Sequence, residues 1–164
     1  MGFIIKCLGS AAVLAFALAL LRGYKAYLAK RREECDGFLA VIEAVRDGVN
    51  YFLSPLGRIF ERFCDGKTTL SKISERIRDG ESPKDAFEKE KRGLHIGECG
   101  KEILSNFFSA LGRGYKDGVV ALSEACRAKF EEYSENCRQE DEKSARLAAT
   151  LAFGGALALI ILFI

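Results

Sequence analysis

The chain has 164 residues, enough for one domain, and its charges almost balance, with 25 Lys and Arg against 23 Asp and Glu. This balance lacks the clear basic excess that nucleic-acid phosphates require, so it excludes a nucleic-acid partner. The charges are unevenly placed, because residues 1–21 carry only Lys6 and residues 147–164 carry none.

The first predicted element is an apolar helix over residues 1–21, long enough to cross a bilayer. Lys6 lies near its end, where the ammonium group can reach the headgroups. A basic cluster follows directly, and such clusters mark the cytoplasmic side of a span. Its members are Arg22, Lys25, Lys30, Arg31 and Arg32. We therefore expect an uncleaved anchor that leaves the middle of the chain in the cytoplasm.

A cleaved signal peptide remains an alternative, because residues 17–19 (Ala-Leu-Ala) have the small-x-small spacing of a cleavage site. It would give a secreted helical domain, cut after Ala19, with oxidised cysteines. In the cytoplasm the six cysteines are instead expected to be small buried hydrophobes. They stand at 7, 35, 64, 99, 126 and 137, form no Cys-x-x-Cys, and accompany a single histidine, His95. This spacing predicts no metal site.

Apolar residues at helical spacing predict that the first helix continues over residues 24–53. A second helix should follow Ser54 as N-cap, with Pro55 at the first helical position. Its apolar face would consist of Leu56, Ile59, Phe60 and Phe63. The Asp-Gly-Lys-Thr-Thr turn at 65–69 should cap a third helix, which Gly80 ends.

Ser82 repeats the cap, followed by Pro83 and by an acid at the third position, Asp85. Glycines predict a break at 92–100 and a last loop at 112–118. The helix between them would bury Ile103, Leu104, Phe107, Phe108 and Leu111.

The last helix begins near Val119, where apolar residues recur every three or four positions as far as Cys137. No proline or glycine occurs between 119 and 153, so the helix should continue into the apolar run 147–164. At about 1.5 Å per residue it would be roughly 65–70 Å long. The predicted fold is all-α, with a helical bundle at 22–146 flanked by transmembrane helices at 1–21 and 147–164.

Small residues recur every fourth position in both apolar runs, which lets helices approach closely in lipid. The two stripes are Ala11, Ala15, Ala19 and Ala148, Ala152, Ala156. One hypothesis is that they pack against each other, so that Ile at positions 15 and 152 weakens folding. Both runs are rich in alanine, so such stripes also arise by chance.

No pattern predicts catalysis. Acids and bases alternate over residues 129–143, as on solvated helix faces. His95 lies in a glycine-rich loop with no Ser or Cys partner at any known spacing, and residues 112–118 lack the Gly-Lys-Ser/Thr ending of a P-loop. We expect no enzyme, no catalytic, cofactor-binding or metal-ligating residue, no cofactor and no small-molecule substrate. The alternative is a membrane-anchored enzyme or ligand sensor with a polar pocket in the bundle.

Several local motifs, in order, resemble the stage III sporulation protein AB family. Residues 54–63 (SPLGRIFERF) resemble its Thr-Pro-Leu helix start, and residues 74–82 (SERIRDGES) its Glu-Arg-Leu-x-x-Gly-Glu segment. Residues 85–90 and 101–113, and the end from Lys143, resemble its later helices and closing membrane segment. The chain departs from the family after Leu111-Gly112, and at Gly48, where the family usually has an acid.

The resemblance implies a non-enzymatic platform or scaffold in the channel-like complex between mother cell and forespore of endospore-forming bacteria. The family is distantly similar to the platform proteins of type II secretion and type IV pilus systems, which present helical domains to an ATPase. The implied partners are membrane lipid and other stage III sporulation proteins, including a cytoplasmic ATPase, and an oligomer is left open. The implied location is the mother-cell membrane around the forespore, with the central domain in the cytoplasm.

Overall fold

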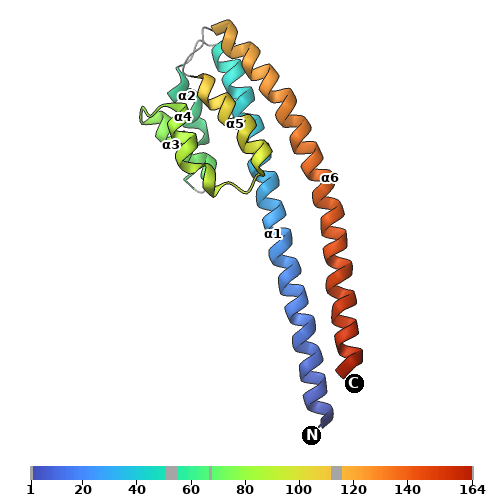
Figure 1. Ribbon diagram of the computed structural model, residues 1–164. Coiled ribbons are helices and arrows are strands. Elements are labelled where there is room, and N and C mark those ends of the chain that lie inside the picture. Colours follow the sequence, from blue (N-terminus) through green and yellow to red (C-terminus); the bar gives the residue numbers. More distant parts are fainter. Residues whose placement is uncertain (1, 51–54, 67, 112–115, 164) are drawn as a thin grey trace. The chain divides into compact units, whose positions relative to one another are not determined.

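The computed structural model describes residues 2–50, 55–66, 68–111 and 116–163, without the side chains of residues 2–8, 10, 11, 50, 116, 117, 159, 160, 162 and 163. These residues form six α-helices and two 3-10 helices and contain no strand (Figure 1). The predicted all-α class is confirmed.

The chain forms two compact units. Unit 1 consists of the residues up to Lys30 and from Cys137 onward, and unit 2 of residues 31–136. Both long helices contribute to both units. The predicted three-part division at residues 21 and 146 stays a prediction.

The two long helices are continuous: α1 extends from Gly2 to Asn50 and α6 from Lys116 to Phe163. Each is about 70 Å long at about 1.5 Å per residue. The predicted continuation of each apolar run into the adjoining helix is therefore confirmed for the backbone. The loop predicted at 112–118 is wrong at its end, because α6 already includes Gly118, and residues 112–115 lie outside the described part.

Four shorter helices complete unit 2. They are α2 (Leu56–Phe60), α3 (Thr69–Arg78), α4 (Pro83–Glu90) and α5 (Glu98–Leu111), with the 3-10 helices η1 (Glu61–Phe63) and η2 (Lys91–Gly93) after α2 and α4. The apolar faces predicted for α2 and α5 are buried, apart from Leu56, Phe63 and Ile103, which are partly buried against the same core.

Phenylalanine rings form the centre of unit 2. Phe108 of α5 stacks on Phe87 of α4, with ring centroids 4.9 Å apart and planes at 12°. Phe108 also meets Phe38 of α1 edge-on at 6.3 Å, and Phe38 meets Phe130 of α6 at 6.4 Å. Each such pair adds roughly 0.5–1.5 kcal/mol beyond area burial, so the rings join four helices at one place.

The predicted stop at Gly80 is confirmed. Gly80 has φ +96°, a left-handed conformation that glycine adopts without penalty. Its N–H donates to the carbonyl of Ile77 at 3.1 Å, and the N–H of Glu81 donates to the carbonyl of Arg76 at 2.9 Å. These two bonds satisfy carbonyls at the end of α3 and turn the chain towards α4.

The caps at 68 and 82 also form. The hydroxyl of Thr68 accepts the N–H of Ser71 at 3.1 Å, and the hydroxyl of Ser82 accepts the N–H of Asp85 at 3.2 Å, with Pro83 opening α4 as predicted. For α2 the prediction is wrong by one residue. Pro55 keeps an extended ψ of 143° and is the N-cap, so α2 begins at Leu56. Ser54 lies outside the described residues.

Two glycines within helices mark close contacts between helices. A Cβ added at Gly48 of α1 would lie 2.5 Å from Cδ1 of Ile59 in α2. A Cβ added at Gly100 would lie 2.5 Å from Cε1 of Tyr133 in α6. The break predicted at 92–100 is therefore wrong after Gly97, because Gly100 serves packing and α5 begins at Glu98.

Candidate membrane anchor and helical docking domain

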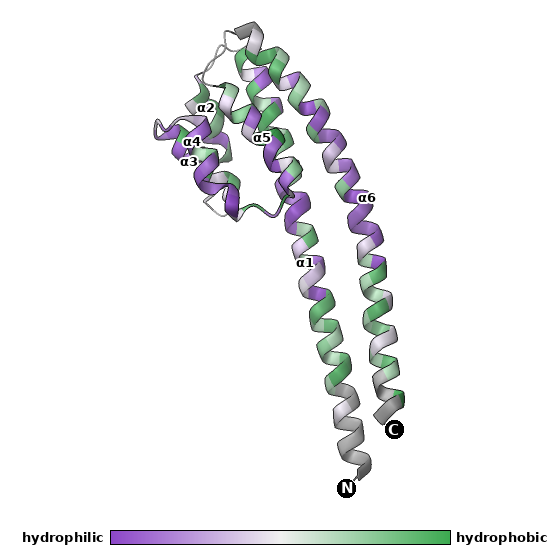
Figure 2. Ribbon diagram, viewed as in Figure 1, coloured by the Kyte–Doolittle hydropathy of each residue, from purple (hydrophilic) through white to green (hydrophobic). Residues whose placement is uncertain are grey.

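Exposed large apolar side chains gather in unit 1. In the part of the chain that the structure describes, every one of them belongs to this unit, and unit 2 has none. Figure 2 shows hydrophobic residues along α1 and α6 towards the two ends of the chain. On α1 they are Leu14, Phe16, Leu18, Leu20, Tyr24 and Tyr27, and on α6 Leu147, Leu151, Phe153, Leu157 and Ile161. Phe16 is 67% exposed and Leu151 74%, so this surface needs an apolar cover.

Within the described residues, α1 is the one helix long and apolar enough to cross a membrane. The candidate segment is Ala12–Val49, and only 6% of its most apolar window is buried, unlike the core helix of a soluble protein. The second predicted span, at 147–164, includes side chains outside the described residues, although the backbone of α6 is helical to Phe163. That span stays a prediction.

Basic and tyrosine side chains follow the apolar part of α1. Arg22, Lys25 and Lys30 are exposed, and Tyr24 and Tyr27 are 36% and 46% exposed. We call these five residues the α1 belt. Tyrosine, lysine and arginine are enriched at membrane interfaces, so the belt is typical of the headgroup region.

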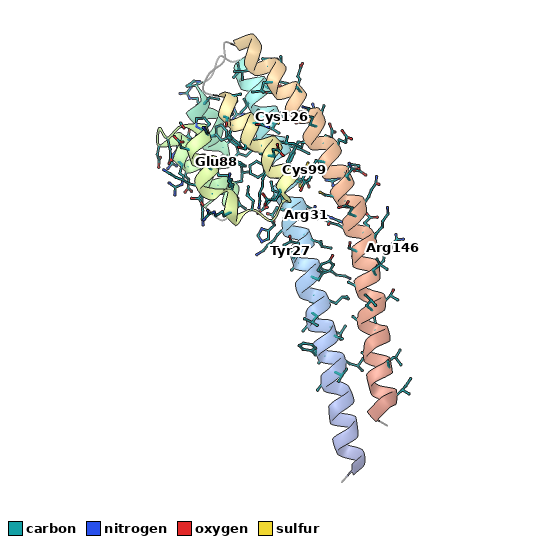
Figure 3. The ribbon with its side chains drawn as sticks, in the orientation of Figure 1. Tyr27, Arg31, Glu88, Cys99, Cys126 and Arg146 are labelled. Atoms are coloured by element: carbon teal, nitrogen blue, oxygen red, sulfur yellow. The ribbon has the colours of Figure 1, made fainter. Side chains whose placement is uncertain are left out.

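The predicted basic cluster is divided between the two units. Arg31 and Arg32 are half-buried at the start of unit 2 and have interaction partners within the protein. On α6, Arg146 is exposed directly before Leu147 (Figure 3). Three of the five predicted anchor residues are therefore available at the surface of unit 1.

The two alanine stripes differ in exposure. On α6, Ala148 and Ala152 are half-buried and Ala156 is 4% exposed, whereas Ala15 and Ala19 of α1 are exposed. The side chain of Ala11 lies outside the described residues. The less exposed side of α1 in unit 1 consists of Val13, Ala17, Leu21 and Leu28. Packing of one stripe on the other stays a prediction.

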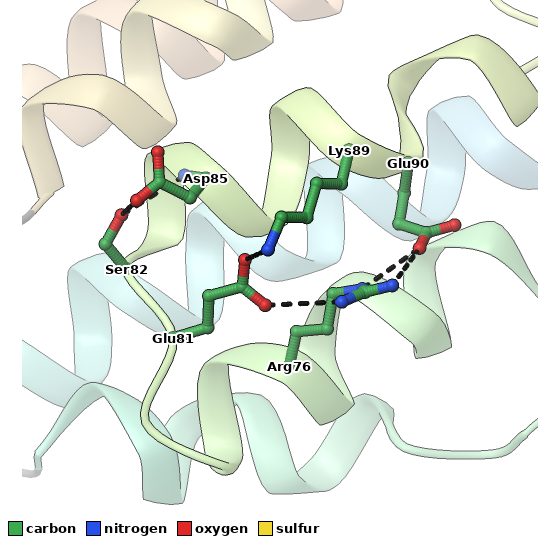
Figure 4. A network of polar contacts seen from close by, with 6 residues as sticks. All are labelled: Arg76, Glu81, Ser82, Asp85, Lys89 and Glu90. Carbon is green, nitrogen blue, oxygen red and sulfur yellow. Dashed lines mark hydrogen bonds and ion pairs between the residues drawn. The ribbon is translucent and has the colours of Figure 1, made fainter.

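In unit 2, charged side chains join α3 and α4. Arg76 donates to Glu81 at 3.3 Å and to Glu90 at 2.9 Å, and Lys89 also donates to Glu81 (Figure 4). The hydrogen bond from Lys89, with that from Arg76, holds the pKa of Glu81 below its ordinary value. Each exposed pair contributes little alone, but the network fixes the orientation of α4 against α3.

The segment Leu94–Gly97, here the 94–97 segment, is held by both long helices. Glu34 of α1 is 9% exposed, and its Oε2 accepts the backbone N–H of His95 at 2.6 Å. Its Oε1 lies 2.9 Å from Nδ1 of the His95 ring. From α6, the hydroxyl of Tyr133 accepts the N–H of Gly97 at 2.8 Å. Leu94 and Ile96 point into the core at 5% and 2% exposure.

Sequence reasoning missed this arrangement. The sequence implied no Ser or Cys partner for His95, and it gave no sign of Glu34, which stands 61 residues earlier and which no spacing rule connects to His95. A weak local signal existed in Gly97 and Gly100, which leave room for Tyr133. The arrangement has a structural role, since it satisfies two backbone N–H groups beside the core.

Burial divides the described cysteines. Cys35, Cys126 and Cys137 are buried, as predicted, but Cys99 is exposed and Cys64 is half-buried, so the prediction is wrong for these two. Figure 3 labels Cys99 and Cys126. Burial raises the pKa of the Cys126 thiol to about 11. Because the thiolate is the reactive form, Cys126 should resist alkylation at mildly alkaline pH.

We expect iodoacetamide at pH 8 to modify Cys99 first, Cys64 more slowly, and Cys126 only after unfolding. Peptide mapping by mass spectrometry of the full chain gives the rate at each site. Labelling in urea is the control, since all thiols should then react at similar rates. Equal rates for Cys99 and Cys126 in the folded chain would contradict the burial described above.

These features define an all-helical protein with one compact helical unit rich in charged residues and a second unit in which two long helices expose apolar side chains. The chain belongs to the stage III sporulation protein AB family, whose sequence profile matches residues 6–164. No curated protein and no solved structure matches it. It is thus a stage III sporulation protein, and the resemblance seen in its motifs is confirmed.

Proposed function

We propose that this sporulation protein is a non-enzymatic membrane platform. It would be a scaffold subunit of the secretion-like channel complex that links mother cell and forespore during endospore formation. Its two apolar ends cross the mother-cell membrane around the forespore, and unit 2 lies in the cytoplasm.

The observation that carries this proposal is the separation of exposed apolar surface from charged surface. Leu14, Phe16, Leu147 and Leu151 are exposed in unit 1, while the large apolar side chains of unit 2 are covered. Lipid covers such a surface on helices of this length without any further protein. The basic residues of the α1 belt favour the cytoplasmic side for the end of α1 that enters unit 2.

Unit 2 suits a docking role. Its ring cluster packs α2, α4 and α5 together with α1 and α6, and its ion pairs join α3 to α4, so that acidic and basic side chains are held on its surface. Complementary charges on a partner would give specificity and fast association. The partners that we propose are the other stage III sporulation proteins and their cytoplasmic ATPase.

Membrane insertion is tested by extraction and proteolysis. The full chain should remain in the membrane fraction in alkaline carbonate. Protease added outside intact cells should leave unit 2 whole, and the same protease should digest it in inverted vesicles. Release by carbonate, or digestion from outside, would contradict the proposal.

Docking is tested by co-purification. The tagged full chain, solubilised in mild detergent from sporulating cells, should retain the proposed cytoplasmic ATPase. An unrelated membrane protein with the same tag is the control. Failure to retain the ATPase both in detergent and in reconstituted membranes would contradict the platform role. The proposal that the protein is anchored in the membrane would still stand.

A further inference from the structure

We propose that the basic side chains of the α1 belt bind the anionic headgroups of phospholipids. The inference rests on the proposed insertion of α1 into the membrane and adds the class of lipid that the protein prefers. Arg22, Lys25 and Lys30 would contact the lipid phosphates, and Tyr24 and Tyr27 would set the depth.

The three basic side chains of the α1 belt lie on one side of the helix. At about 100° per residue, residues 22, 25 and 30 lie within about 140° of the helix circumference. The centre of this arc is about 120° from Leu21 and Leu28, which are half-buried and buried. The three cations therefore point away from the covered side of α1 and remain exposed.

Among the described residues, the basic side chains of the α1 belt lack acidic partners that would neutralise their charge. No Asp or Glu precedes Glu33 in the sequence. The described residues provide no ion pair for Arg22, Lys25 or Lys30, whereas Arg31 and Arg32 have interaction partners. An uncompensated group of three cations at a membrane surface attracts anionic lipid.

The neighbours of the α1 belt indicate that it lies at the depth of the lipid headgroups. Leu18 and Leu20, 42% and 59% exposed, directly precede the belt, so a bound phosphate would lie beside apolar surface suited to acyl chains. Tyr24 and Tyr27 present an aromatic ring with a polar tip, which favours the interface. A phospholipid offers both the phosphate and the chains, whereas free phosphate offers only the charge. We therefore assign the ligand to lipid.

The test measures lipid binding to the purified full chain in mild detergent by native mass spectrometry. Phosphatidylglycerol should bind more tightly than phosphatidylcholine. Each basic side chain near a surface contributes about fivefold, so the triple variant R22Q/K25Q/K30Q should lose roughly a hundredfold in affinity for phosphatidylglycerol. Its affinity for phosphatidylcholine should not change.

The matched control is R58Q/R62Q/K72Q, which removes three exposed charges from unit 2. It should bind phosphatidylglycerol as the wild type does. Equal affinity of the wild type for both lipids, or an equal loss in the control variant, would overturn the inference. Displacement of phosphatidylglycerol by excess inorganic phosphate would also overturn it, because the site would then recognise phosphate alone.

Carbonate extraction separates this inference from the proposed function. Release of the wild-type chain by carbonate means that the anchor itself is wrong. Retention without a preference for phosphatidylglycerol leaves the anchor and removes only the lipid specificity.

Discussion

Replacing Phe108 by alanine is expected to lower the free energy of unfolding by about 4 kcal/mol, in the middle of the range for core aromatic residues. The ring is 1% exposed and contacts four other rings, those of Phe38, Phe60, Phe87 and Phe107. Its loss leaves a cavity between α1, α4 and α5. Urea unfolding of the full chain in detergent micelles, followed by circular dichroism, measures the change.

Two companion variants make this result interpretable. Phe108→Leu fills most of the space and should cost less than half as much. Asn106→Ala, at an exposed position on the same helix, should change stability by no more than about 0.5 kcal/mol. A loss below 1 kcal/mol in Phe108→Ala would show that the ring cluster is not the centre of the fold.

Replacing Glu34 by alanine is expected to cost about 3 kcal/mol. The carboxylate accepts the backbone N–H of His95 and contacts the ring, and bonds to a charged group are worth about 1.5–3 kcal/mol each. Alanine also leaves the N–H of His95 without its acceptor. Urea unfolding gives the free energy, and hydrogen exchange at the His95 amide reports the local effect.

Glu34→Gln keeps an oxygen for the His95 N–H and should lose about half as much stability. Glu33→Ala removes the neighbouring exposed carboxylate and should be close to neutral. If Glu33→Ala and Glu34→Ala behave alike, the contacts of Glu34 do not stabilise the 94–97 segment.

Features set by nearest neighbours could be predicted from the sequence. Ser82, Pro83 and Asp85 form a cap within four residues, and Gly80 ends α3 through bonds that reach only five residues back. The apolar residues that recur at helical spacing in α5 and α6 are buried or partly buried, as that spacing predicts. The apolar runs at both ends of the sequence likewise predicted the exposed apolar side chains of unit 1; the membrane role stays a proposal.

Features set by contacts between distant residues could not be predicted. Gly100 looks like a turn residue until Tyr133 is seen against it, and the partner of His95 lies on α1. The basic cluster after residue 21 reads as one group, because sequence does not show that Arg31 and Arg32 are half-buried in unit 2. Which side of α1 other residues of the protein cover also depends on packing between segments distant in the sequence.

The contact of Gly100 with Tyr133 links three positions in evolution. Even a methyl group at position 100 would overlap the tyrosine ring, so a larger residue there demands a smaller one at 133. Losing the tyrosine also removes the hydroxyl that accepts the N–H of Gly97. Homologues with a residue larger than glycine at 100 should therefore carry a residue smaller than tyrosine at 133, and the backbone N–H of residue 97 then needs another acceptor.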